Sequence, residues 1–226
     1  MFKSIKTSVI AVILIGTAIV AKAQKVIEQG TITYDIEYNL TEEQRKVIDP
    51  SLLPQQSKVK FNGNVSKVEI DMGAAQIKIL TDATEHNALV LVDVPIMQKQ
   101  YAAKMTKADL DKQAGNLTYS DFTPTGEKQT IGGYSAEKYS YKDNNGSNYE
   151  VWIAPGLKLS SGAILPQFAK LNGSPVKYSY SQKGLKNTLT LKSVKEEKIA
   201  PISLAVPSGY EMTTMDALDA MRGGGE

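Results

Sequence analysis

Residues 31–38 of this 226-residue chain read TITYDIEY, and their pattern recurs along most of the sequence. The even-numbered positions, from Ile32 to Tyr38, are aliphatic or aromatic, whereas the positions between them are Thr, Asp and Glu. Alternation with a period of two residues is typical of a β-strand that buries one face. The segment is therefore predicted to be a strand of a half-buried sheet.

Ten further segments show the same alternation, or a short apolar run between turn residues. The stretch 88–94, ALVLVDV, is apolar on both faces except for Asp93, which predicts a central strand covered on both sides. Together the segments predict a mainly β fold of about eleven strands, as a curved antiparallel sheet or unclosed β-barrel with a few short helices. The remaining strand predictions are 58–62, 65–72, 76–82, 117–123, 134–142, 148–153, 175–181, 185–194 and 202–206.

Two of the short helices are predicted from their first residues. Thr41 and Gln44 have the spacing of a capping box, which predicts a helix over 42–48. A second helix is predicted to start at Thr106 and to stop at Gly115.

Two further helices are predicted nearer the C-terminus. Residues 162–171 carry apolar side chains at helical spacing, and the helix they predict is either a lid or part of the core. The last helix is predicted over 215–221, before a Gly-rich tail at 223–226 that is expected to be disordered. No long linker divides residues 24–222, which are predicted to form a single domain.

The segment 139–153 allows two hairpin registers. A two-residue Asn-Gly turn would divide its apolar side chains between both faces. A three-residue loop over 144–146, with its glycine in the left-handed conformation, pairs Tyr141 with Tyr149 and gathers the apolar side chains on one face. Burial favours this odd-length loop, which leaves Trp152 on the opposite face, in need of a covering helix or a ligand.

The N-terminus has the features of a secretory signal peptide: two lysines, an apolar run over 8–20 and an Ala-Lys-Ala site at 21–23. Cleavage after Ala23 is predicted, which places the protein in the periplasm or, as the alternative, outside the cell. An uncleaved anchor is the rival interpretation, but only 15 uncharged residues separate Lys6 from Lys22, and a spanning helix needs about 20. Without cysteine there is no lipid-attachment residue, so no permanent membrane anchor is expected.

Composition excludes several chemistries. The chain has no cysteine, and His86 is its only histidine, which excludes a thiol nucleophile, a disulfide framework and the usual zinc sites. A Ser-His-Asp triad could be built only on His86, which lies in a turn without visible partners. Without the three lysines of residues 1–23, the chain has 23 basic and 24 acidic residues, which gives no reason to expect nucleic-acid binding. The acidic loop at 143–150 does not have the EF-hand spacing, so no calcium site is predicted there. The sequence has no phosphate-binding glycine loop and no dinucleotide fingerprint, and no enzyme activity, cofactor or metal is predicted.

Tyrosines are the most informative side chains, because several of the eleven lie on predicted strands. Their rings can fill the core, or some can line an apolar cavity while the hydroxyl group reaches a polar head group. Under the second interpretation, the candidate ligand-binding residues are Tyr34, Tyr38, Tyr139, Tyr141, Val151 and Phe168.

Three short motifs occur in a characteristic order: TIGGYSAEKY at 130–139, EVWIA at 150–154 and VPSGYEM at 206–212. This order resembles an exported family of unknown function from Bacteroidetes-type Gram-negative bacteria. Many members of that family have cysteine at the position of Ala136, so the resemblance implies no thiol role in this chain. The family is similar in predicted architecture to the LolA/LolB lipoprotein carriers, which implies an unclosed antiparallel barrel with helices in an apolar interior.

Two functions are compatible with these observations. The first is a non-enzymatic periplasmic binding protein or carrier of a lipid or another apolar ligand, which would need a pocket of about 300 Å³ or more. The alternative is an envelope scaffold or protein-interaction module that uses a sheet edge or an aromatic patch around Trp152.

Overall fold

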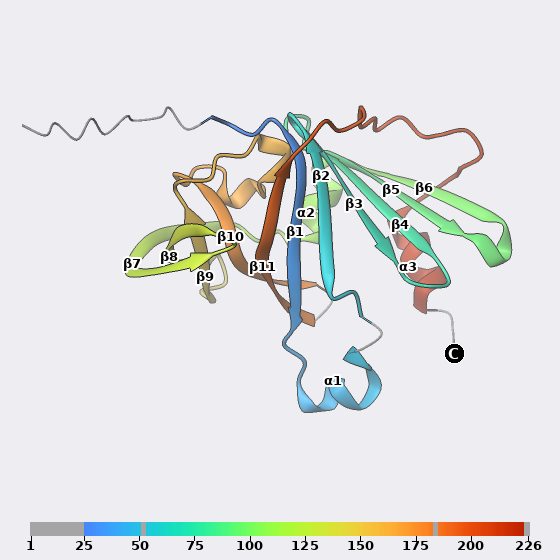
Figure 1. The fold of residues 1–226 in the computed structure, drawn as a ribbon. Coiled ribbons are helices and arrows are strands. Elements are labelled where there is room, and N and C mark those ends of the chain that lie inside the picture. Colours follow the sequence, from blue (N-terminus) through green and yellow to red (C-terminus); the bar gives the residue numbers. More distant parts are fainter. Residues whose placement is uncertain (1–24, 51–52, 183–184, 224–226) are drawn as a thin grey trace, which may run out of the picture.

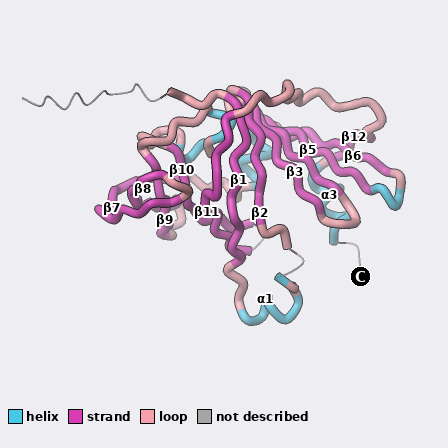
Figure 2. Tube along the Cα trace, viewed as in Figure 1, coloured by secondary structure: helices cyan, strands magenta, loops and turns pink. Residues whose placement is uncertain are grey.

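The computed structural model of the protein describes residues 25–50, 53–182 and 185–223. The predicted signal peptide at 1–23 lies outside these residues, as do residues 224–226 of the predicted tail, whereas its first residue, Gly223, ends the last helix. Within them the chain forms one twelve-stranded sheet and three short α-helices (Figures 1 and 2).

The order of the strands across the sheet is β12-β6-β5-β4-β3-β2-β1-β11-β10-β9-β8-β7. All pairs are antiparallel except β12 and β6, and β12 and β7 form the two edges of an open sheet. The strands are β1 Gln29–Tyr38, β2 Gln56–Asn62, β3 Val65–Asp71, β4 Gln76–Asp82, β5 Asn87–Val94, β6 Lys99–Met105, β7 Tyr119–Ile131, β8 Tyr134–Asp143, β9 Asn148–Ala154, β10 Ser174–Gln182, β11 Leu185–Glu196 and β12 Glu211–Thr213.

The helices are short and lie between or after the strands. The α-helices are α1 Glu42–Val47, α2 Lys107–Gln113 and α3 Met215–Gly223. Single 3-10 turns form η2 Pro95–Met97, η3 Ser161–Ala163 and η4 Pro166–Phe168.

The central strands spread like a fan (Figure 1). They converge at the end that carries the connections 63–64 and 83–86, which we call the narrow end. They splay at the end that carries the connections 39–55, 72–75 and 95–98, which we call the wide end. Strands β7–β10 curl away on the other side of β11.

One apolar row crosses seven neighbouring strands and defines the faces of the sheet. Residues directly opposite in antiparallel strands point to the same face. We call the face with this row the inner face, and the other the outer face. The row consists of Val194, Ile32, Val59, Val68, Ile79, Val90 and Ala103.

The core has three parts. The aromatic core lies on the inner face of β1, β2 and β8–β11, where it includes Phe61, Tyr178 and the loop residue Phe168. At the other end of the sheet, Leu218 of α3 and Leu110 of α2 pack on the inner face of β5 and β6. On the outer face, the extended segment 199–210 crosses β4–β6 and packs side chains such as Leu204 and Tyr210 on them. Strand β5 is thus covered on both sides, as its sequence predicts.

One strand prediction is wrong, and two strands were missed. Residues 202–206 do not form a strand. Their alternating apolar side chains pack on the outer face of the sheet, and their backbone crosses the strands without pairing with them, as a strap. Strands β6 and β12 were not predicted; β6 contains two alanines and two lysines, which have weak β propensity, and β12 has only three residues. The open, curved sheet itself is as predicted, with ten of its strands in the expected segments.

Three of the helix predictions are confirmed, and one is wrong. The capping boxes of Thr41 and Thr106 are formed, and α3 begins at Met215 as expected. Residues 162–171 form the turns η3 and η4 instead of a helix. The backbone of Leu165 is extended, as the residue before a proline prefers, and this breaks the helical run at its centre.

The β8–β9 hairpin has the predicted register, with Tyr141 opposite Tyr149 and Tyr139 opposite Val151. The Asp143 N–H donates to the Ser147 carbonyl at 3.1 Å, which closes a three-residue loop. Its glycine has a φ of 82°, in the left-handed region. The Asp143 carboxylate accepts hydrogen bonds from two backbone N–H groups of its own loop, so it serves as a loop cap.

Candidate functional site

The six predicted ligand-binding residues lie in or beside the aromatic core. Four of them are buried by other protein atoms: Val151 and Phe168 have no exposed surface, and Tyr34 and Tyr141 are 3 % exposed. Tyr139 is half-buried at the border of this core. Tyr38 is half-buried near the wide end of β1, where its hydroxyl donates to the Pro54 carbonyl at 2.9 Å.

Aromatic rings fill the interior of this region. The Phe168 ring lies 5.8 Å from that of Tyr141 and 5.6 Å from that of Tyr178, both at edge-on angles. Tyr34 contacts Tyr178 in the same way, at 5.8 Å, and Phe122 stacks on Tyr141 at 4.7 Å. These are the separations that aromatic pairs prefer. The rings therefore pack favourably against one another, and Phe168 fills the core as a plug.

The buried tyrosine hydroxyls stay neutral. Burial raises the pKa of Tyr34, Tyr141 and Tyr178 far above the usual value, because a phenolate is poorly solvated there. None of these hydroxyl groups is suited to act as a base near neutral pH. Their role is packing.

Beyond the aromatic core, the middle of the inner face is aliphatic. A second row runs parallel to the first across β3, β4 and β5, where Ile70 lies opposite Ile77 and Ile77 opposite Val92. Together with Val68 and Ile79 of the first row, these side chains form a continuous aliphatic surface. We call Val68, Ile70, Ile77 and Ile79 the aliphatic floor.

The aliphatic floor remains partly exposed, whereas the inner face on both sides of it is covered. All four side chains of the floor are half-buried. On one side, α2 and α3 pack on β5 and β6. On the other, the loop with η3 packs on the narrow ends of β2 and β3, and Phe168 closes the aromatic core. The floor is therefore the part of the inner face that can accept an additional apolar partner.

Sequence reasoning did not single out the aliphatic floor, although its signal was present. The alternation in 65–72 and 76–82 places these four side chains on one face of two predicted strands. It does not show which part of that face a helix or loop will cover.

A polar group lies at the wide end of the inner face. Asn187 of β11 pairs with Tyr38 on one side and Tyr180 on the other. Its side-chain amide is buried, and Oδ1 finds no hydrogen-bond partner among the described residues. An unpaired buried polar group costs about 1–3 kcal/mol.

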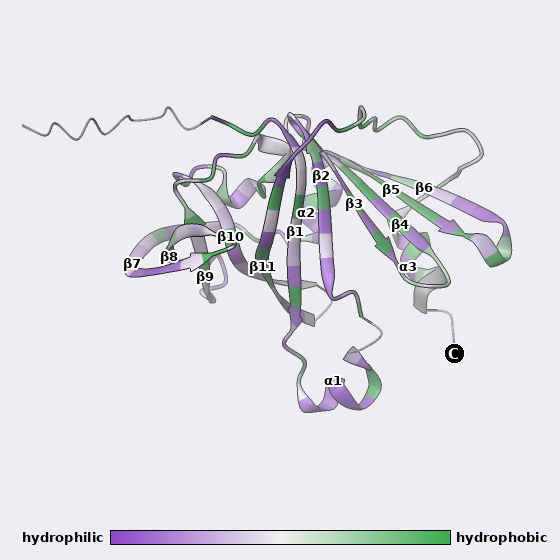
Figure 3. Cartoon of the chain, in the orientation of Figure 1, coloured by the Kyte–Doolittle hydropathy of each residue, from purple (hydrophilic) through white to green (hydrophobic). Residues whose placement is uncertain are grey.

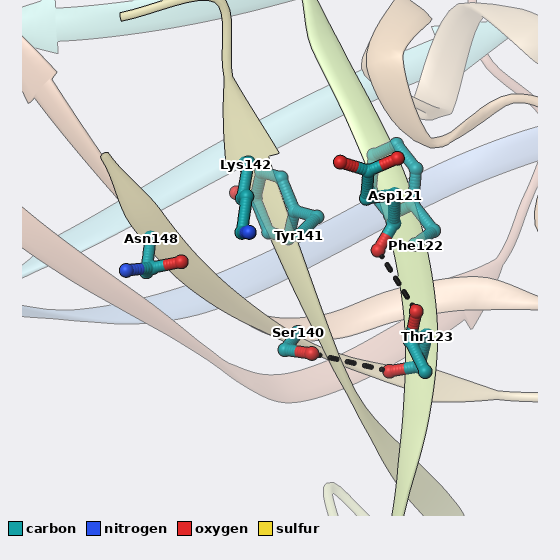
Figure 4. A pocket seen from close by; sticks show the side chains of 7 residues that line it. All are labelled: Asp121, Phe122, Thr123, Ser140, Tyr141, Lys142 and Asn148. Carbon is teal, nitrogen blue, oxygen red and sulfur yellow. Dashed lines mark hydrogen bonds between the residues drawn. The ribbon is translucent and has the colours of Figure 1, made fainter. Parts of the chain in front are cut away.

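The pocket in Figure 4 has a volume of about 490 Å³ and lies between β7 and β8. There the ladder is interrupted between Ser120 and Thr123, and Asp121 has a φ of 60°. Phe122 and Tyr141 are its only apolar lining residues, and the others are Asp121, Thr123, Ser140, Lys142 and Asn148. This polar pocket is not the apolar interior that was expected of a lipid-binding barrel.

The surfaces expected of a scaffold are protected. Trp152 is half-buried, and the Lys138 ammonium group lies 5.9 Å from the centre of its ring. Glu150 and Glu127 hold that ammonium group at 2.8 and 3.2 Å. A cation from the neighbouring strand thus covers part of Trp152, where the sequence predicted a helix or a ligand. The edge strand β7 contains Pro124 and two irregularities of register, which hinder pairing with another strand.

The described part of the chain holds no group of side chains suited to a metal ion. There, no three His, Cys, Asp or Glu side chains are grouped so that they could hold a metal ion. His86 is exposed in the turn between β4 and β5. Among the described helices, none has the length and hydrophobicity needed to span a membrane.

Comparison with known proteins gives only distant structural likenesses. No protein-family model and no curated protein matches the chain. The lipoprotein LppX of Mycobacterium tuberculosis is 13 % identical, with a TM-score of 0.39, over 78 % of this chain and 90 % of LppX. MucB is 12 % identical, with a TM-score of 0.29, over 83 % of this chain and 60 % of MucB. Neither likeness identifies a functional residue here.

Proposed function

We propose that this protein binds a lipid, or another molecule with an acyl chain, on the aliphatic floor, and that it acts as a carrier without catalysing a reaction. The proposal includes export to the periplasm, with cleavage after Ala23, as the N-terminal sequence predicts. The resemblance of its motifs to the exported family with LolA/LolB-like architecture supports the same function.

The partly exposed aliphatic floor is the observation that carries the proposal. Its side chains belong to neighbouring strands and form an apolar surface without charged residues among them. Transfer of an acyl chain from water to such a surface gains up to about 0.8 kcal/mol per buried methylene. Ten half-buried methylenes would contribute about 4 kcal/mol and ten fully buried ones about 8 kcal/mol, which are the free energies of a millimolar and a micromolar Kd.

The polar group at the wide end supports a position for the head group. A ligand that lies along the floor would extend toward Tyr38 and Asn187, where Oδ1 could accept a hydrogen bond from a hydroxyl or amine once the side chains that bury it move aside. The six residues predicted from sequence therefore have two proposed roles. Tyr38 contacts the ligand, and the other five form or border the core beside it.

A matched pair of variants on β3 tests the proposal. Val68 and Val65 are both half-buried, but Val68 belongs to the floor and Val65 points to the outer face. Threonine has the shape and β propensity of valine but adds a hydroxyl. Burial of that hydroxyl under an acyl chain costs about 1–3 kcal/mol, so Val68→Thr should weaken binding of a fluorescent fatty acid roughly ten-fold.

The control variant Val65→Thr should bind the same probe as tightly as the unaltered protein, in a titration with the exported and processed chain. Equal affinity of both variants and the unaltered chain would contradict binding at the floor. Absence of measurable binding by the unaltered chain, together with a stoichiometric protein partner after purification, would favour the scaffold.

A further inference from the structure

Among the described residues, seven large apolar side chains are exposed, and four of them lie on connections at the wide end. They are Val47 at the end of α1, Met72 between β3 and β4, and Ile96 and Met97 between β5 and β6, and they are 83, 45, 85 and 64 % exposed. We call them the tip residues. Figure 3 shows hydrophobic colour at the β5–β6 tip and at the end of α1.

The narrow end differs sharply from the wide end. Its β2–β3 connection is Gly63–Asn64, and its β4–β5 connection is Ala83-Thr-Glu-His86, so neither carries a large apolar side chain. Adjacent antiparallel strands alternate their connections between the two ends. The apolar tips are therefore a property of one end of the sheet and not of hairpin connections in general.

We propose that the wide end docks on a lipid membrane by inserting the tip residues into the interfacial layer. This inference builds on the proposed function, because a lipid ligand has to leave or enter a bilayer near the opening of the inner face. Isolated apolar side chains on separate tips fit a fluid layer, which closes around each of them. A protein partner would require a more continuous complementary surface.

The charges near the tips favour apolar insertion over attraction to anionic lipids. Helix α1 has both acidic and basic residues, Glu42 and Glu43 in its first turn and Arg45 and Lys46 in its last. Beside the β5–β6 tip, the Lys99 ammonium group lies 3.8 Å from the Glu211 carboxylate. The cations thus have acidic neighbours, so binding should depend little on salt or on anionic lipid.

Sedimentation with phosphatidylcholine vesicles tests this inference. The exported, processed chain should bind such vesicles, and 0.5 M salt should change the bound fraction less than two-fold. The double variant Ile96→Ser/Met97→Ser should lower the partition coefficient by about ten-fold or more, because two large apolar side chains no longer leave water. The control Val26→Ser removes a side chain that is 39 % exposed and precedes β1 at the narrow end, and it should bind normally.

Three results would overturn the inference: no vesicle binding by the unaltered chain, equal binding by the double variant, or a dimer that forms through the tips and is lost in that variant. The test is separate from that of the ligand site. The double variant should keep its affinity for a fatty acid in solution, whereas Val68→Thr should keep its affinity for vesicles. Failure of docking alone would thus leave the carrier proposal intact.

Discussion

Phe168 occupies the space that a ligand would need if the tyrosine-rich region were a cavity. Its side chain has no exposed surface and meets the rings of Tyr141 and Tyr178. The sequence predicted apolar spacing around this residue, but it could not distinguish a lid from a plug. The ring contacts make that distinction, because they close the interior from the loop side.

Substitution of this plug should be severe. Phe168→Ala is expected to lower the free energy of unfolding by about 3–5 kcal/mol, as large-to-small substitutions of buried aromatic residues do. Urea denaturation checks this, with Leu165→Ala as the control, because Leu165 is 37 % exposed and one turn away. If Phe168→Ala were as stable as Leu165→Ala, Phe168 would cover an open space and would not fill the core.

Asp93 is the residue that ties the outer strap to the sheet. Its carboxylate accepts hydrogen bonds from Tyr210 of the strap, from Lys78 at 2.9 Å and from Gln100 at 3.0 Å. Burial opposes ionisation, but these hydrogen bonds together lower the pKa of the Asp93 carboxyl. Its stabilising effect is therefore present above the unfolded pKa of about 4 and is lost as the pH falls through the lower folded pKa.

The variant Asp93→Asn should accordingly be less stable by about 1–3 kcal/mol at pH 7. The difference from the unaltered protein should shrink as the pH is lowered from about 5 to below the folded pKa, because protonation removes the same charge. Thermal unfolding over this range measures it. A difference that stays constant from pH 7 to pH 3 would contradict this role of the carboxylate.

At the scale of elements, local sequence rules correctly predicted the features that depend only on residues close together in the sequence. The capping boxes at Thr41 and Thr106 and the three-residue loop over 144–146 follow from neighbours within a few positions. The rules failed at 202–206 and 162–171. There, apolar spacing was satisfied by packing on the outer face or into the aromatic core, without the hydrogen bonds of a strand or helix.

The β8–β9 loop provides a test at this scale. Deletion of Asn145 leaves a two-residue connection, which forces one strand to shift and exchanges its faces. Either Tyr141 or Val151 would then leave the aromatic core, so the variant should unfold at a much lower temperature or fail to fold. The substitution Asn145→Ser keeps the length of the loop and serves as the control. Equal melting temperatures of both variants would mean that the loop length does not set the register.

At the scale of the whole molecule, the sheet could be predicted from the sequence, but the binding surface could not. Alternation identified ten strands and the direction of their faces. The aliphatic floor depends on which strands become neighbours and on how far α2, α3 and the loop before β10 extend over the inner face. Both result from contacts between segments far apart in the sequence.

Photocrosslinking with a diazirine-labelled fatty acid tests the central claim most directly. The exported chain is loaded with the probe and irradiated, and modified peptides are mapped by mass spectrometry. Binding on the aliphatic floor predicts adducts on β3 and β4, in residues 65–82, which an excess of unlabelled fatty acid suppresses. Competable adducts confined to residues 134–168 would instead place the ligand among the aromatic side chains and would contradict the proposed site.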